Sequence, residues 1–225
     1  MYGSIAKIYD QAGWPDFSGQ TYRKLKPLLK IWQVKTHLDL ACGTGDFCTL
    51  ARDSGIDTMG VDNSPEMVKI ARDKFPLIKF RVMDMRDFNL KAKFDLITCL
   101  FDSINHLASF KDWRKTFLSA YSNLNNNGRF LFDANTISTV NKHASAVKKI
   151  NGQTLLIDRR NIGQDMCRFT VEYGGEKILS VKEKGFRFEK IKKEIVNVGF
   201  QEPEILFGSV EKPDLESRIF ILARK

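Results

Sequence analysis

The amino-acid sequence predicts an α/β fold: a doubly wound, mostly parallel seven-stranded sheet with a small antiparallel β insertion after the fifth strand. Up to residue 133, short apolar runs alternate with amphipathic segments of helical period, which is typical of parallel strands joined by helices. A glycine-rich turn at residues 43–45 follows the first run. Beyond residue 133 the alternation stops, and turn signals at residues 161–163 and 174–175 favour short antiparallel strands.

Seven segments fit the strands of the main sheet. The fourth, residues 94–100, is a mostly apolar run, as expected for a parallel strand that is covered on both faces. The last two follow the insertion and can close the sheet. The seven segments are residues 36–40, 58–61, 79–83, 94–100, 129–132, 204–207 and 218–223.

Capping residues mark the helices between these strands. Ser64 and Pro65 open one helix as N-cap and first residue, and Pro76 ends it. An amphipathic stretch at residues 17–32 contains Pro27, which we expect to bend the helix or to start it. Further helices are predicted from residue 47, over residues 110–124 before a turn at 125–128, and over residues 186–198 before Gly199.

Composition and charge restrict the class of protein. No apolar run approaches the ~18 residues that span a bilayer. There is no signal-peptide pattern, and the four cysteines show neither zinc spacing nor a paired framework. We therefore expect a cytoplasmic protein with no metal site and no membrane partner. The net charge of +9 suits an anionic partner, but the basic clusters lack the interleaved aromatic side chains that stack bases, which disfavours nucleic acid.

The glycine-rich turn indicates the kind of ligand. A strand, a turn containing Gly43 and Gly45, and a helix together form a nucleotide-cofactor site, because the turn brings backbone N–H groups close to the ligand. The third glycine of the dinucleotide fingerprint is missing, and Asp46 puts negative charge where a pyrophosphate would bind. The turn therefore favours a cationic, phosphate-free ligand such as S-adenosylmethionine over NAD.

Three carboxylates stand at the ends of three successive predicted strands: Asp39, Asp62 and Asp84. Asp62 lies 19 residues after Gly43, a spacing at which an acidic side chain binds a ribose diol. Asp84 can accept a hydrogen bond from the adenine amino group, and Asp39 can offset the ammonium charge of the ligand. Each could instead be a turn former, but packing alone does not explain the set, since buried carboxylates need partners.

These motifs resemble the class I S-adenosylmethionine-dependent methyltransferases, which have a Rossmann-like fold. The segments LDLACGTGD, GVDNSPEM and VMDMRDF resemble the motifs around the cofactor, and FDLITCLFDSINHL resembles the amino-sugar N,N-dimethyltransferase and glycine N-methyltransferase group. The resemblance implies a single methyltransferase domain over residues 1–225. Its expected parts are a helical cap at 1–35, a cofactor-binding half at 36–133, the antiparallel insertion at 153–184 and a return to the core sheet at 185–225.

The resemblance also implies the site residues. The expected cofactor-binding residues are Tyr22, Asp39, Ala41, Gly43, Gly45, Asp62, Asn63, Met67, Asp84, Met85 and Leu100. The expected catalytic residues are His106, as a proton acceptor, and Tyr9, near the methyl group. His106 could equally be a packing or capping residue at the start of the next helix. After the fifth strand, the segment DANTIS replaces the tryptophan-rich substrate segment of the sugar enzymes.

The methyl acceptor is not disclosed by the sequence. The first hypothesis is a small-molecule methyltransferase, directed to nitrogen or oxygen, in which in-line alignment and removal of water provide most of the catalysis. The second is a methyltransferase that acts on RNA or protein. The third is a module that binds the cofactor without catalysis. The oligomeric state, monomer or dimer, also stays open.

Overall fold

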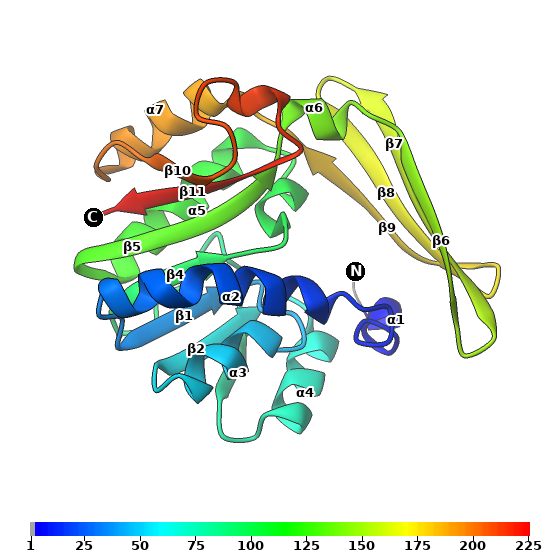
Figure 1. Ribbon diagram of the computed structural model, residues 1–225, viewed down its shortest axis with the longest axis horizontal. Coiled ribbons are helices and arrows are strands. Elements are labelled where there is room, and N and C mark those ends of the chain that lie inside the picture. The colour runs from blue at the N-terminus through cyan, green and yellow to red at the C-terminus, as the bar shows by residue number, and fades with distance from the viewer. Residues whose placement is uncertain (1–2) are drawn as a thin grey trace.

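The computed structural model describes residues 3–225 and is built around a seven-stranded sheet of order β10-β11-β5-β4-β1-β2-β3 (Figure 1). Strands β1 to β5 run parallel to one another, whereas β11 is antiparallel to both of its neighbours, β10 and β5. The predicted fold class is therefore confirmed. The strands are β1 (Thr36–Leu40), β2 (Asp57–Asp62), β3 (Lys79–Val82), β4 (Phe94–Cys99), β5 (Leu124–Asn135), β10 (Glu204–Phe207) and β11 (Arg218–Arg224).

Helices cover both faces of this sheet, and each face has its own apolar cluster (Figure 1). On one face Trp113 and Phe117 of α5 (Phe110–Asn123) pack with Ile191 of α7 (Phe188–Val198). On the other face Leu25 of α2 (Pro15–Ile31) packs with Phe47 of α3 (Asp46–Asp53). The remaining helical elements are α1 (Gly3–Ala6), α4 (Pro65–Lys74), α6 (Ile137–Val140) and the 3-10 turns η1 (Ser103–His106) and η2 (Pro213–Leu215).

Two local expectations need correction. Of the two alternatives for Pro27, a bend or a helix start, the start is wrong, because α2 begins at Pro15 and continues through Pro27, with Leu25 and Leu29 buried on either side of it. The turn expected at residues 125–128 lies within β5 as an irregularity of the strand. Asn127 has φ +65°, and the pairing with β4 shifts register there. By contrast, the capping at Ser64 is as predicted, since its side chain accepts a hydrogen bond from the Met67 N–H.

A second, antiparallel sheet projects from the main one, in the order β6-β7-β8-β9 (Figure 1). Its strands are β6 (Ala144–Ile150), β7 (Gln153–Gly163), β8 (Met166–Tyr173) and β9 (Glu176–Lys184). The boundary expected at residue 153 is too late, because the sheet already begins at Ala144. The edge strand β6 is exposed over almost its whole length, so it lacks the alternation of apolar residues that would reveal it.

The N-terminal segment joins the two sheets. Ile5 and Ile8 are buried in a cluster with Met67 of α4 and with Leu155 and Leu179 of the second sheet. Residues 1–2 of the expected helical cap lie outside the described residues. Within residues 3–225, no helix combines the length and the apolar character needed to span a membrane. Through the contacts of Ile5 and Ile8, the N-terminal segment encloses the space between the second sheet and the carboxyl ends of the parallel strands.

Candidate active site

The glycine-rich turn brings β1 onto α3 through three residues in left-handed conformation: Ala41, Gly43 and Gly45, with φ of +54°, +54° and +88°. Gly45 is the N-cap of α3. A Cβ atom on Gly45 would lie 2.7 Å from Cζ of Phe80, so Gly45 permits close packing of α3 and does not itself face a cavity. Gly43, by contrast, lies beside the hydroxyl of Tyr9.

Asp62 ends β2 and ties this turn to the next one. Its carboxylate accepts hydrogen bonds from the N–H of Gly43 at 2.9 Å and from the N–H of Ser64 at 2.8 Å. Burial raises the pKa of Asp62, although these backbone hydrogen bonds oppose the shift. The carboxylate is thus held in a fixed orientation at the edge of a cavity.

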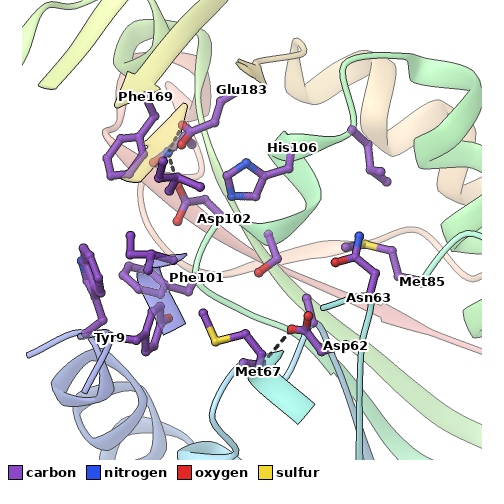
Figure 2. A pocket seen from close by; sticks show the side chains of 18 of the residues that line it. Tyr9, Asp62, Asn63, Met67, Met85, Phe101, Asp102, His106, Phe169 and Glu183 are labelled. Carbon is purple, nitrogen blue, oxygen red and sulfur yellow. Dashed lines mark hydrogen bonds between the residues drawn. The ribbon is translucent and has the colours of Figure 1, made fainter. Parts of the chain in front are cut away.

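That cavity has a volume of about 470 Å³ and lies between the main sheet, the N-terminal segment and the second sheet (Figure 2). Asp62 and Met67 lie at one end, Glu183 and Phe169 at the other, and His106 lies between them (Figure 2). It brings together eight of the residues expected from the sequence: Tyr9, Ala41, Gly43, Asp62, Asn63, Met67, Met85 and His106. Asp39 and Leu100 line a small adjoining cavity of about 40 Å³, which they share with Tyr9, Ala41 and Gly43.

Tyr22 is not part of this cavity, and its expected place near the cofactor is wrong. Its ring packs against Phe47 with a centroid distance of 5.6 Å, in the apolar cluster between α2 and the sheet. Asp84 is also absent from the lining of the large cavity. Its carboxylate binds the guanidinium of Arg86, with an N–O distance of 2.6 Å, and it is Arg86 and Met85 that line the cavity. The hydrogen bond from Arg86 lowers the pKa of Asp84.

Asp39 belongs to a buried polar network. Thr98 donates to its carboxylate, and His37 contacts the hydroxyls of Thr58 and Thr98, both at 2.8 Å. Burial raises the pKa of Asp39 to about 7 and lowers the pKa of His37 to about 3. The imidazole of His37 is therefore neutral in this network. A positive charge nearby would stabilise the ionised form of Asp39.

The loop after β4 is shaped by Asp133. Phe101 and Asp102 have φ of +61° and +48°, and their N–H groups both donate to the buried Asp133 carboxylate. Successive N–H groups in this arrangement form an anion-binding nest. Arg218 completes the unit by binding both Asp133, at 2.7 Å, and Asp102, at 2.8 Å. Burial raises the pKa of Asp133 to about 6, and the positive charge of Arg218 opposes this shift.

Asn135 connects this loop to the second sheet. Its side-chain amide nitrogen donates to Asp102 and, at 3.1 Å, to Glu183 of β9. The sequence reasoning missed Glu183, Asn135, Arg159 and Arg218, all of which line the cavity. A signal for Glu183 was present, because Leu179, Val181 and Glu183 alternate along β9 and are all buried. A carboxylate that continues an apolar stripe with period two points into the interior.

The two expected catalytic residues both face the cavity (Figure 2). Burial raises the pKa of Tyr9, and the negative charges of Asp62 and Asp102 raise it further, so its hydroxyl stays protonated and can donate a hydrogen bond. Burial lowers the pKa of His106, whereas Asp102 opposes this shift. His106 is therefore neutral at pH 7.

The chain resembles known methyltransferases in sequence and in fold. Residues 38–128 match the family described as methyltransferase domain. A glycine/sarcosine N-methyltransferase of Parasynechococcus marenigrum is 25% identical over 186 residues, which cover 78% of this chain and 66% of that protein. A dTDP-3-amino-3,6-dideoxy-alpha-D-glucopyranose N,N-dimethyltransferase of Streptomyces fradiae is 37% identical over 112 residues, 47% of this chain and 43% of that protein.

A solved structure extends the similarity to the whole chain. An S-adenosylmethionine-dependent methyltransferase from Clostridium acetobutylicum superposes with a TM-score of 0.79 at 23% identity, over 99% of this chain and 98% of that one. The expected fold is thereby confirmed. The chain has the fold of the class I S-adenosylmethionine-dependent methyltransferases, and residues 38–128 match a methyltransferase domain. This chain spans only 66% of the length of the glycine/sarcosine N-methyltransferase and 43% of the length of the N,N-dimethyltransferase.

Proposed function

We propose that this protein transfers the methyl group of S-adenosylmethionine to the amine of a small molecule that enters the large cavity. The observation that carries this proposal is the arrangement of that cavity. A site suited to a phosphate-free nucleoside lies at one end, and a group of buried carboxylates lies at the other. Both relatives named above act on amines of small molecules, which supports the same class of acceptor.

The cofactor end fits S-adenosylmethionine in its chemistry. Asp62 offers a fixed carboxylate to a ribose diol, and Met67 and Met85 offer apolar contact to an adenine ring. The first turn of α3 disfavours a pyrophosphate, because the negatively charged Asp46 carboxylate stands there, paired with Lys74 at 2.9 Å. When bound, S-adenosylmethionine supplies an electrophilic methyl group on a sulfonium.

The opposite end fits a cationic acceptor. Two carboxyl groups, those of Asp102 and Glu183, line this end together with the guanidinium groups of Arg159 and Arg218, and Arg218 also binds the buried Asp133. With all five ionised, one negative charge is left over, and a protonated amine would balance it. Ile157, Phe169 and Leu179 add an apolar wall, which excludes water from the nucleophile.

A macromolecular acceptor is the second candidate, and the net charge of +9 is its main support. The N-terminal segment and the second sheet both line the cavity, which suits a small acceptor better than an RNA or a protein. We further propose a cytoplasmic location, because all four cysteines are free and buried.

The test is transfer of labelled methyl groups from S-adenosylmethionine to an extract of small metabolites, with identification of the product by mass. We expect an N-methylated small molecule. Label that appears only in RNA or in protein would contradict the proposed acceptor class. Binding of S-adenosylmethionine without transfer to any acceptor would contradict catalysis itself.

A further inference from the structure

Glu183 is a buried carboxylate that forms no salt bridge with any of the described residues 3–225. It is 3% exposed, close to the end of β9, and its side chain turns toward the cavity beside Asp102 and His106 (Figure 2). Among residues 3–225, Asp102 and Asp133 each form a salt bridge with Arg218, whereas Glu183 forms none. Its carboxylate therefore keeps capacity for a partner from within the cavity.

The hydrogen bonds of Glu183 hold it in place without neutralising it. Asn135 donates to its Oε2 atom, and the thiol of Cys167 lies 3.7 Å from the same oxygen. Asn135 is itself fixed, because its backbone N–H donates to the side chain of Asn105 at 2.9 Å. Neutral donors of this kind orient a carboxylate and leave its charge in place.

We propose that Glu183 is a catalytic residue, which binds the protonated amine of the acceptor and accepts a proton from it before the methyl group is transferred. This inference rests on the proposed function. A protonated amine has no lone pair, so it must lose a proton before it can attack a methyl group. Glu183 meets the geometric need, because it lies in the same cavity as the cofactor residues and is shielded from water.

The proton and electron balance is complete without another reactant. The N–H bond of the ammonium breaks, its proton goes to a carboxylate oxygen of Glu183, and the nitrogen keeps the electron pair. That pair forms the N–C bond as the S–C bond breaks, and the electrons of the broken bond stay on sulfur. The methylated amine leaves as a cation, and Glu183 releases its proton to water.

The ionisation of Glu183 suits this role. Burial raises its pKa to about 7, and the charge of Asp102 adds to the shift, whereas Asn135, Arg159 and Arg218 oppose it. A group with this pKa is partly ionised at pH 7 and can both take up and release a proton. The other titratable groups around it are Asp133, His106 and Cys167.

A binding measurement tests the ammonium site without turnover. The side-chain carboxyl signal of Glu183 can be assigned by ¹³C NMR from its loss in Glu183→Gln, and followed with pH in the S-adenosylhomocysteine complex. The probe is methylammonium chloride, compared with sodium chloride at equal concentration. We expect methylammonium to lower the apparent pKa of Glu183, because it stabilises the carboxylate. The exposed Glu176 at the start of β9 is the control, and its side-chain carboxyl signal should respond equally to the two salts. Equal pKa values of Glu183 in the two salts would overturn the proposal.

A kinetic comparison tests the proton transfer. The acceptors are the fraction of a metabolite extract that a cation exchanger retains at neutral pH. We expect Glu183→Gln to bind S-adenosylhomocysteine like the parent but to lose roughly 10²–10⁴-fold in methyl transfer, the usual contribution of a general base. Glu183→Asp should recover part of the rate, and Glu176→Gln should match the parent.

The outcomes separate this inference from the proposed function. N-methylation by Glu183→Gln at nearly the parental rate would overturn the role of Glu183 and leave the methyltransferase activity standing. An O-methylated product from the unretained fraction would overturn both the role of Glu183 and the amine acceptor of the proposed function, and would leave only the methyltransferase activity standing. Absence of transfer by the parent protein to every fraction would contradict the proposed function, and the role of Glu183 with it.

Discussion

The Asp62 carboxylate accepts a hydrogen bond of 2.9 Å from the backbone N–H of Gly43, and so joins the end of β2 to the glycine-rich turn. The two residues lie 19 positions apart in the chain and face the same cavity. One carboxylate thus shapes the turn and also lines the cavity.

Replacing Asp62 with asparagine should weaken cofactor binding, because two charge-assisted hydrogen bonds to the ribose become neutral or are lost. The expected loss is on the order of 2–4 kcal/mol. Calorimetric titration with S-adenosylhomocysteine measures it. Asp57→Asn, at the exposed start of the same strand, is the control and should bind like the parent. Parental affinity in a folded Asp62→Asn protein would remove Asp62 from the binding site.

Gly45→Ala should destabilise the fold by about 2–4 kcal/mol, because the new Cβ would meet the Phe80 ring at 2.7 Å in a backbone with φ +88°. Gly55→Ala separates the two causes, since Gly55 has φ +83° but no atom within 4 Å of a Cβ. It should cost only about 1 kcal/mol, from backbone strain. Urea unfolding of both variants gives the comparison. Equal losses in the free energy of unfolding would show that Gly45 is needed only for its left-handed backbone conformation. The close approach to Phe80 would then contribute little.

The two tyrosines expected at the site should behave differently. Tyr9→Phe should slow methyl transfer, because the Tyr9 hydroxyl is a protonated donor in the cavity. Tyr22→Phe should leave both binding and transfer unchanged, because Tyr22 lies in the apolar cluster with Phe47 and its hydroxyl has no hydrogen-bond partner. Steady-state rates and S-adenosylhomocysteine affinities of both variants decide the matter. A strong effect of Tyr22→Phe on cofactor affinity would contradict the position of Tyr22.

His37 should make the fold sensitive to acid. Its pKa is about 3 in the folded protein and 6.5 in the unfolded chain, so the unfolded chain binds more protons between these values. Its contribution to stability is complete above pH 6.5 and is lost as the pH falls toward 3. Between pH 6.5 and 5 the parent should lose about 2 kcal/mol more than His37→Gln. The free energy of unfolding of both proteins, measured at each pH, checks this, and equal losses in the parent and in His37→Gln would contradict a buried neutral His37.

The parallel half of the fold could be predicted from the sequence, because its signals are local. Ser64 and Pro65 cap α4 as expected, and the mostly apolar β4 is buried along almost its whole length. β6 could not be found, since a strand exposed on both faces has no apolar period. The residues next to Gly43 and Asp62 that line the cavity follow from spacing within one βαβ unit, so their position in the cavity could also be predicted.

The other end of the cavity could not be predicted in the same way. Asn135, Glu183 and Arg218 come from three strands that are far apart in the chain, and only the packing of the second sheet brings them together. Tyr22, by contrast, was expected at the site but does not line the cavity. Its place in an amphipathic helix matched a loose motif, but the helical period turns its ring into the core.

Calorimetric titration of the unmodified protein with S-adenosylhomocysteine and, separately, with NAD tests the central claim most directly. The turn at Gly43 and Gly45 is followed by Asp46, whose carboxylate, paired with Lys74, occupies the first turn of α3. We expect S-adenosylhomocysteine to bind as a single site and NAD to bind far more weakly, because its pyrophosphate would meet this carboxylate. Tighter binding of NAD than of S-adenosylhomocysteine would contradict the assignment of the cavity to a methyltransferase cofactor.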